Sequence, residues 1–370
     1  MAKPSWHYPR KALAKHYLQS VDLGMMNRIA LLGVRRVGKT EFLLRDLCPL
    51  ALEEGLLPIY VNLWASPERP HETLLHALQR AVEGLGSKGA FASMLNAEVR
   101  KMEVGNSLLG KMGLEFAAQV PRIESDDLMV IAQLLEKLAE TPNCKPLLII
   151  DEIQHLAQNS AFLPLQSALR TIFDTLGEKL PIIYAGSSRS GIQAMFSDNK
   201  MPFYNSAFMV EFPVLDDAFV HHCTELLATH FNLHYDNIAL ASVFNQTFDS
   251  SPFWFSKLVQ HLIMNKCDIN EATDIVCDQI ILDGDFENLS RSLKALDKAV
   301  LITIGEGQKK LYADETLQII RERFGVSVKS SGMTAALNKL QRRQLISQLS
   351  RSDYIIENAG FVDFLLRNND

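Results

Sequence analysis

The segment GVRRVGKT, at positions 33–40, constrains the fold of this chain most strongly. It has the spacing GxxxxGKT, follows the short apolar run Arg28–Leu32 and precedes an amphipathic helical pattern. Glycines in such a loop let the backbone point its amide groups at an anion, and the helix that follows adds the positive end of its dipole. The motif in this context predicts a strand, a phosphate-binding loop and a helix, which together begin a parallel α/β sheet.

The loop predicts a site for ATP and Mg²⁺. Lys39 has the length and charge to reach the β- and γ-phosphates, and the Thr40 hydroxyl would ligate a Mg²⁺ ion that bridges phosphate oxygens. Which of the two loop arginines contacts phosphate, if either does, stays open, because both also suit a solvated basic loop. The residues expected to bind the nucleotide are Gly33, Val34, Arg35, Arg36, Val37, Gly38, Lys39, Thr40 and Glu41.

A second motif, KPLLIIDEIQHL, places two acids directly after an apolar strand. Asp151 is expected to hold Mg²⁺ through water, together with Thr40. Glu152, one residue further, would accept a proton from the water that attacks the γ-phosphate, which makes it the candidate catalytic base. Two acids after a buried strand are also common as surface residues, but their pairing with a phosphate loop favours the catalytic interpretation.

A third apolar run, KLPIIYAGSSRSGI, ends in two hydroxyls followed by an arginine. The carboxyl ends of parallel strands converge on the nucleotide crevice of a doubly wound sheet, so Ser187 or Ser188 would hydrogen-bond the attacking water or the γ-phosphate. Arg189 would neutralise charge that develops in the transition state. The competing interpretation is a polar turn between a strand and a helix, which needs no catalytic role.

Residues 1–212 are predicted to form the P-loop core, with an N-terminal helix and an insertion at about 84–128. Short apolar runs alternate there with longer helical patterns, which is typical of a parallel sheet covered by helices. Their apolar residues are continuous rather than alternating, so we expect every strand to be buried on both faces. The predicted strands are Arg28–Leu32, Leu57–Asn62, Leu147–Asp151, Leu180–Gly186 and Phe208–Phe212.

Residues 213–290 are predicted to form a helical lid. Strand-like runs stop after Pro213, and the apolar residues then follow the spacing of amphipathic helices. The predicted helices are Asp216–Phe231, Asp236–Thr247, Pro252–Asn265 and Glu271–Asp283.

Residues 291–370 are predicted to form a winged helix-turn-helix domain. From Leu296 onward the sequence predicts three successive helices, and Ser330 or Ser331 is expected to cap the third. The residues that follow, Leu345–Ile356, have the alternating pattern of strands. A recognition helix needs polar and basic side chains on one exposed face. Double-stranded DNA is one candidate partner and a protein is the other, because such modules also serve in protein packing. The residues expected to contact DNA are Lys329, Thr334, Asn338, Lys339, Arg342 and Arg343.

The composition limits other functions. The formal net charge is −6 and the pI is about 6.0, so nucleic-acid binding would need a local basic patch. The five cysteines are scattered without metal-binding spacing, and we expect them to be reduced in the cytoplasm. No apolar run reaches the length of a membrane span and no signal-peptide core is present, so no membrane association is expected.

Taken together, GVRRVGKT, LLIIDE and YAGSS resemble the core motifs of AAA+ and STAND-type P-loop ATPases, particularly the prokaryotic "archaeal ATPase" family. The resemblance covers most of the chain, because that family also has a helical lid and a C-terminal winged helix after its nucleotide core. By motif match it assigns Lys39, Thr40, Asp151, Glu152 and Ser187 to nucleotide, metal, base and sensor positions.

Two departures from the family pattern concern the lid. Similar proteins carry a Gly-x-Pro segment whose proline lies near the adenine; the closest match is Ser250–Pro252, so Pro252 is the implied contact although the glycine is absent. No arginine that would match the AAA+ sensor arginine lies between Pro252 and Arg291. The resemblance therefore implies slow hydrolysis, or an arginine supplied by a neighbouring subunit in a nucleotide-dependent oligomer.

Two functions are consistent with these motifs. In the first, Mg²⁺-dependent ATP hydrolysis drives a conformational change and the engagement of DNA or a protein partner. In the second, bound ATP or ADP sets a slow regulatory switch or scaffold whose winged helix binds protein rather than DNA. A phosphotransferase is less favoured, because Glu152 beside Asp151 suits the activation of water.

Overall fold

The computed structural model describes residues 6–24, 26–85, 89, 93, 95–100, 123–283, 286–291, 293–326, 328–343, 345–350, 353–357 and 359–367. These residues divide into two compact units. The core unit comprises His7–Gly33 and Gly38–Pro213, and the helical unit comprises Trp6, Val34–Val37 and Val214–Asp370. Most of the predicted insertion at 84–128 lies outside the described residues.

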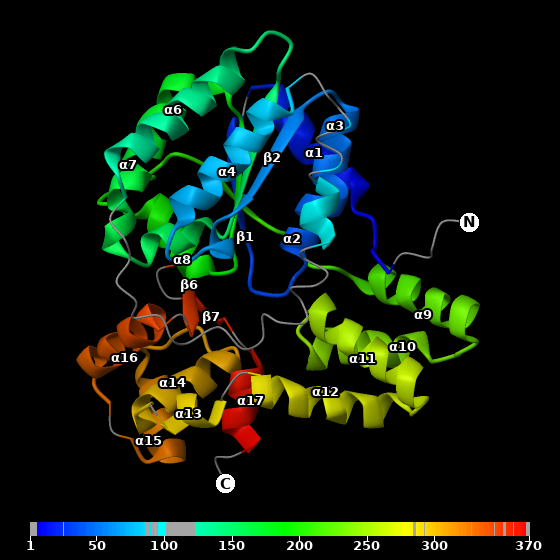
Figure 1. The fold of residues 1–370 in the computed structure, drawn as a ribbon. Helices are drawn as coiled ribbons and strands as arrows, with labels where there is room; N and C mark the ends of the chain where they lie inside the picture. Colours follow the sequence, from blue (N-terminus) through cyan, green and yellow to red (C-terminus); the bar gives the residue numbers. More distant parts are fainter. Residues whose placement is uncertain are drawn as a thin grey trace. The chain divides into compact units, whose positions relative to one another are not determined.

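The core unit is built on a parallel sheet with the strand order β2-β3-β4-β1-β5 (Figure 1). Neighbouring strands are in parallel register, for example Arg28 opposite Ile182 and Asn62 opposite Asp151. Because β1, β4 and β3 are adjacent, the residues that follow their carboxyl ends meet at one edge of the sheet. The strands are β1 (Arg28–Leu32), β2 (Leu57–Asn62), β3 (Pro146–Asp151), β4 (Ile182–Ala185) and β5 (Phe208–Glu211).

Helices cover both faces of this sheet (Figure 1). On one face, Ile150 and Tyr184 pack in a core cluster with apolar residues of α4, α6, α7 and α8, such as Leu74 and Leu169; α1, α2 and α3 lie on the other. A π-helical turn, Leu43–Leu47, joins α2 to α3. The helices are α1 (Lys11–Asp22), α2 (Lys39–Phe42), α3 (Cys48–Glu53), α4 (Pro70–Glu83), α6 (Ser125–Glu140), α7 (Leu163–Leu176) and α8 (Arg189–Ser197).

The expectation that every strand is buried on both faces is wrong for β5. This strand lies at the edge of the sheet, and Phe208 at its start is 60% exposed. All four residues of β5 are at least partly exposed, whereas β3 and β4 are buried throughout and β2, at the other edge, is largely buried. The strand β4 is also shorter than predicted, because it excludes Leu180 and Gly186.

The helical unit begins with helices close to those predicted. The second predicted helix divides into α10 and a π-helical segment, Val243–Thr247, and the fourth begins at Ile269 rather than Glu271. Among the described residues of the whole chain, no helix combines the length and the apolar character that crossing a bilayer requires. The helices are α9 (Asp217–Phe231), α10 (Asn237–Ser242), α11 (Pro252–Asn265) and α12 (Ile269–Asp283).

The rest of the helical unit packs around its own core, which includes Val300, Leu337 and Phe361. The predicted serine cap is wrong: Lys329 occupies the N-cap position of α16 and makes no side-chain cap, because the helix already includes Ser330. The elements are α13 (Phe286–Arg291), α14 (Ala295–Gly305), α15 (Asp314–Phe324), α16 (Ser330–Arg342), the antiparallel strands β6 (Ile346–Ser350) and β7 (Asp353–Ile356), and α17 (Ala359–Arg367).

Candidate nucleotide site

The phosphate loop leaves β1 and enters α2 as the motif predicts. Gly38 has φ 88°, a left-handed conformation that favours glycine, and Lys39 follows it as the first residue of α2. The Lys39 ammonium donates a hydrogen bond to the Gly33 carbonyl oxygen at 2.6 Å, and Lys39 is buried. The loop therefore holds a buried positive charge at the start of a helix.

The Thr40 hydroxyl and the Asp151 carboxylate are in direct contact. Thr40 Oγ1 donates to Asp151 Oδ2 at 2.7 Å, and the Tyr60 hydroxyl donates to the same oxygen at 2.9 Å. Burial raises the pKa of Asp151, and the charge of Glu152 adds to this shift; the two hydrogen bonds and the charge of Lys39 act in the opposite direction. The two predicted metal ligands thus lie together, although 111 residues separate them.

These residues fit Mg²⁺ and a polyphosphate. Mg²⁺ takes oxygen ligands, usually one or two from the protein, and completes its shell with water and phosphate oxygens. Thr40 Oγ1 and Asp151 Oδ2 form such a pair, whereas no group of three His, Cys, Asp or Glu side chains in the described ranges would hold a metal. The Gly33 and Gly38 loop and the Lys39 ammonium supply the positive environment that phosphates need.

Glu152 follows β3 in a left-handed conformation, with φ 58°. Its Oε2 accepts hydrogen bonds from Ser187 Oγ at 2.8 Å and from the Ser187 amide at 3.3 Å, and a third from Gln154 Nε2. The strand order brings the ends of β3 and β4 side by side, so the predicted base and sensor residues contact each other.

The two residues after Ser187 have other partners. Ser188 Oγ accepts a hydrogen bond from the Gly191 amide at 3.1 Å and so caps α8, as the polar-turn interpretation expects. Arg189 forms an ion pair with Glu211 at the end of β5. A catalytic role for Arg189 stays a prediction.

The middle of the phosphate loop, Val34–Val37, belongs to the helical unit. The Arg36 guanidinium lies 4.5 Å from the centroid of the Phe253 ring and 4.3 Å from that of Trp254, both on α11. The Ser251 hydroxyl donates to the Arg36 carbonyl oxygen at 3.3 Å. Arg36 therefore makes cation–π contacts with two aromatic rings of α11.

Pro252, the predicted adenine contact, is the first residue of α11. Ser250, at the position of the missing glycine, has φ 52°. This left-handed conformation is one that glycine adopts at little cost, so the segment keeps a glycine-like backbone although its sequence departs from the family pattern. A contact between Pro252 and adenine stays a prediction.

One of the six residues predicted to contact DNA forms an ion pair within the fold, and the other five are exposed. Lys339 donates to the carboxylate of Asp297 at 2.5 Å, and the side chain of Asp297 is only 5% exposed. Lys339 therefore neutralises a buried acid, which leaves its charge less available to a ligand. The other five are exposed: Lys329, Thr334, Asn338, Arg342 and Arg343.

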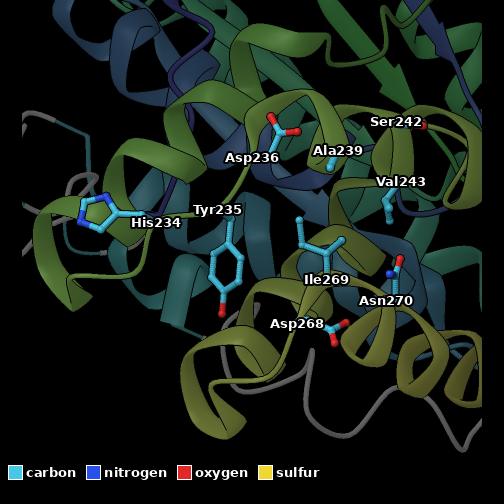
Figure 2. Close-up of a pocket in the computed structure, with 9 residues that line it drawn as sticks. All are labelled: His234, Tyr235, Asp236, Ala239, Ser242, Val243, Asp268, Ile269 and Asn270. Atoms are coloured by element: carbon cyan, nitrogen blue, oxygen red, sulfur yellow. The ribbon is translucent and has the colours of Figure 1, made fainter.

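A hollow of about 510 Å³ lies in the helical unit, and none of the predicted site residues lines it (Figure 2). Its wall combines apolar side chains, such as Ile269, with Asp236 and Asp268. Both carboxylates already accept a hydrogen bond at the start of a helix. Asp236 accepts one from the Ile238 amide at 3.0 Å, and Asp268 accepts one from the Glu271 amide at 2.9 Å. The two carboxylates of the hollow therefore have structural roles at the starts of helices.

Sequence reasoning missed three residues at the site or next to it. Tyr60 hydrogen-bonds Asp151, Gln154 hydrogen-bonds Glu152, and His7 lies 3.1 Å from Glu41, which was expected to bind nucleotide. A tyrosine inside a buried strand was a usable signal for the first. The other two contacts depend on tertiary structure that no local pattern contains.

Comparisons with known proteins identify solved structures with a similar fold. No family model matches the sequence, and no curated protein matches it. The structure resembles the Walker-type ATPase PABY2304 of Pyrococcus abyssi with a TM-score of 0.62 and 20% identity, over 96% of this chain and 95% of that one. This chain has the fold of a Walker-type P-loop ATPase. The P-loop ATPase fold predicted from the core motifs is therefore confirmed at the level of the fold.

A second solved structure supports the Walker-type fold. The ORC2 protein of Aeropyrum pernix, solved as ADPNP–ADP complexes, has a TM-score of 0.52 and 15% identity, over 97% of this chain and 93% of that one. Both similarities extend over nearly the full length of this chain, so they include the helical unit as well as the sheet.

Proposed function

We propose that this chain binds ATP at the phosphate loop and hydrolyses it with Mg²⁺. The observation that carries the proposal is the meeting of two pairs of side chains: Thr40 with Asp151, and Glu152 with Ser187. A hydroxyl and a buried carboxylate suit a metal bound to phosphate, and a second carboxylate beside a hydroxyl suits the activation of water. The similarity to a Walker-type ATPase supports the same conclusion.

Each of these residues has a defined role in the proposed reaction. The loop amides and Lys39 bind the β- and γ-phosphates and balance their charge. When bound, Mg²⁺ neutralises charge on the phosphate oxygens, and Thr40 and Asp151 are the residues that would hold it. Glu152 takes a proton from the water whose oxygen bonds to the γ-phosphorus as the bond to ADP breaks, and Ser187 orients the Glu152 carboxylate.

The proposal extends to the organisation of the chain. We assign a P-loop core to 1–212, a helical lid to 213–290 and a winged helix-turn-helix domain to 291–370. Three helices, α14, α15 and α16, followed by the β6–β7 ribbon support the last assignment. The contacts of Arg36 with Phe253 and Trp254 support coupling between the bound nucleotide and the conformation of the proposed lid. A nucleotide that changes the conformation of the loop would disturb these contacts.

The partner is proposed to be double-stranded DNA, bound through the exposed basic residues of α16 and its ends. Arg342 and Arg343 at the end of the helix and Lys329 at its start support this choice. The alternative is a slow nucleotide-dependent switch that binds a protein, with an arginine supplied by a neighbouring subunit. The pairing of Lys339 with Asp297, and of Arg189 with Glu211, favours that alternative.

The decisive experiment measures ATP affinity and phosphate release for the parent and three variants. Glu152→Gln should retain nucleotide binding and lose about 10²- to 10⁴-fold in turnover, the usual contribution of a positioned base. Lys39→Ala should lose nucleotide binding. The matched control is Glu53→Gln, an exposed glutamate of the core unit, which should behave as the parent. Parent turnover in Glu152→Gln would show that the assigned base is wrong.

A separate experiment tests the partner. Retention of duplex DNA is measured at low and high salt for the parent, Arg342→Gln and Lys339→Gln. If α16 binds the DNA backbone, Arg342→Gln weakens retention and lowers its salt dependence, whereas Lys339→Gln has less effect on both because its charge serves Asp297. Absence of retention at low salt would favour the protein-binding alternative.

A further inference from the structure

Gln154 is a buried polar side chain directed at the proposed base. It lies in the 3₁₀ helix Ile153–Ala157, with 3% of its surface exposed. Its Nε2 donates to Glu152 Oε2 and lies 3.5 Å from Ser187 Oγ. Its Oε1 is buried and has no hydrogen-bond partner among the described residues. A buried amide with an unpaired oxygen costs stability that an apolar side chain would not, so the donated hydrogen bond needs an explanation.

That hydrogen bond fixes one oxygen of the Glu152 carboxylate. Oε2 receives all three hydrogen bonds, from the amide and hydroxyl of Ser187 and from Gln154. Within the described residues, none is donated to Oε1. A carboxylate anchored through one oxygen has a defined orientation, and the other oxygen is left to accept a proton from water.

The position of Gln154 is set by a slot that two glycines create. A Cβ at Gly186 would overlap Gln154 Oε1, and a Cβ at Gly191 would lie 2.9 Å from Gln154 Cβ, closer than real Cβ contacts. Gly186 directly follows β4, and Gly191 lies in the first turn of α8. The absence of a side chain at both positions leaves the space that the Gln154 side chain occupies.

We propose that Gln154 is a positioning residue for ATP hydrolysis, which holds Glu152 in the orientation that activates water. This inference rests on the proposed function, because it presupposes that Glu152 is the base. Gln154 hydrogen-bonds Glu152 and Ser187 rather than any residue of the phosphate loop, so we expect its removal to leave nucleotide affinity unchanged. The loss falls on kcat, because the anchored carboxylate gains freedom to rotate away from the attacking water.

The test compares two buried glutamines that receive the same substitution. Gln154→Met keeps the length of the side chain and removes its donor. Gln166→Met is the matched control: Gln166 is equally buried and also has an unpaired Oε1, but its Nε2 donates to the Leu156 carbonyl oxygen at 2.7 Å rather than to a carboxylate. We expect Gln154→Met to lower kcat about 10-fold or more with an unchanged KM, and Gln166→Met to keep the parent kcat.

A second measurement, on the nucleotide-free protein, tests the slot independently of activity. Gly186→Ala alone should lower the melting temperature, because the new Cβ meets Gln154 Oε1. Combined with Gln154→Ala, the same substitution should be partly or fully tolerated, so the double variant melts higher than additivity predicts. Strict additivity would overturn the close packing on which the inference depends.

The outcomes separate this inference from the proposed function. If the parent releases no phosphate, or Glu152→Gln hydrolyses ATP normally, the proposed function fails. If the parent and Gln166→Met hydrolyse ATP and Gln154→Met does so equally well, only the positioning role is refuted. A kcat above the parent value in Gln154→Met would also refute it, since Gln154 would then restrain Glu152.

Discussion

The replacement of His7 by glutamine should remove a pH-dependent part of the stability. His7 Nδ1 lies 3.1 Å from Glu41 Oε1, and Nε2 lies 3.0 Å from Asp46 Oδ1, an oxygen that also accepts from the Arg10 amide. Burial alone would lower the pKa of His7, but the hydrogen bonds and charges of Asp46 and Glu41 outweigh it and raise the pKa from 6.5 to about 9. The charged imidazole thus compensates a carboxylate whose side chain is 1% exposed.

The magnitude follows from the difference between the two pKa values. The rise in the pKa of His7 from 6.5 to about 9 corresponds to at most about 3–4 kcal/mol, at about 1.4 kcal/mol for each pKa unit. Glu41 is half exposed and Arg45 lies 3.6 Å from it, so screening reduces the expected contribution to about 1–2 kcal/mol. Because the folded pKa is the higher one, this stability is fully present below about pH 6.5 and is lost as the pH rises through about 9.

Urea unfolding at about pH 6 and about pH 10 measures this contribution. His7→Gln should unfold at lower urea than the parent at the lower pH, and the two proteins should converge at the higher pH. The control is His16→Gln, an exposed histidine on α1, which should follow the parent at both. A stability difference between parent and His7→Gln that is equal at the two pH values would refute the assignment of charge to His7.

Three further substitutions test other contacts by urea unfolding. Ser250→Val should destabilise the fold by about 1–2 kcal/mol while Ser250→Gly should not, because a β-branched residue strains at φ 52°; equal effects would contradict this. Lys339→Met should cost about 1–2 kcal/mol, since it leaves Asp297 buried without its cation; a neutral result would show that Asp297 is otherwise satisfied. Tyr60→Phe should cost about 1–2 kcal/mol through the hydrogen bond lost to Asp151, and no change would contradict that geometry.

The elements that sequence reasoning found are those whose signal is local. The phosphate loop, β1 and the acids after β3 each depend on a short apolar run followed by a fixed pattern, and the structure has the strands where these predict them. The prediction failed where the cover supplied by the rest of the fold decides: β5 has the composition of an interior strand, yet its four residues are all at least partly exposed, whereas β2 at the other edge is largely buried.

The contacts within the site were predictable only in part. Parallel strands end at a common edge, so the proximity of Ser187 to Glu152 followed from topology alone. Arg189 leaves the same strand end but pairs with Glu211, because its side chain points to β5 rather than to β3. Gln154 follows the two acids after β3 without a recognisable pattern of its own, and its importance appears only when the two glycines that make room for it are located in space.

Backbone conformation singles out the site independently of any motif. Among the described non-glycine residues with positive φ, half are Asn or Asp, which adopt that conformation readily. The exceptions are Arg36, Glu152, Ser250 and Lys266, and the last ends α11, where such a residue is ordinary. The other three occupy the phosphate loop, the proposed base and, within the proposed lid, the turn that precedes α11. Each such conformation costs on the order of 1 kcal/mol, so its retention at these three positions is an argument for function that owes nothing to sequence resemblance.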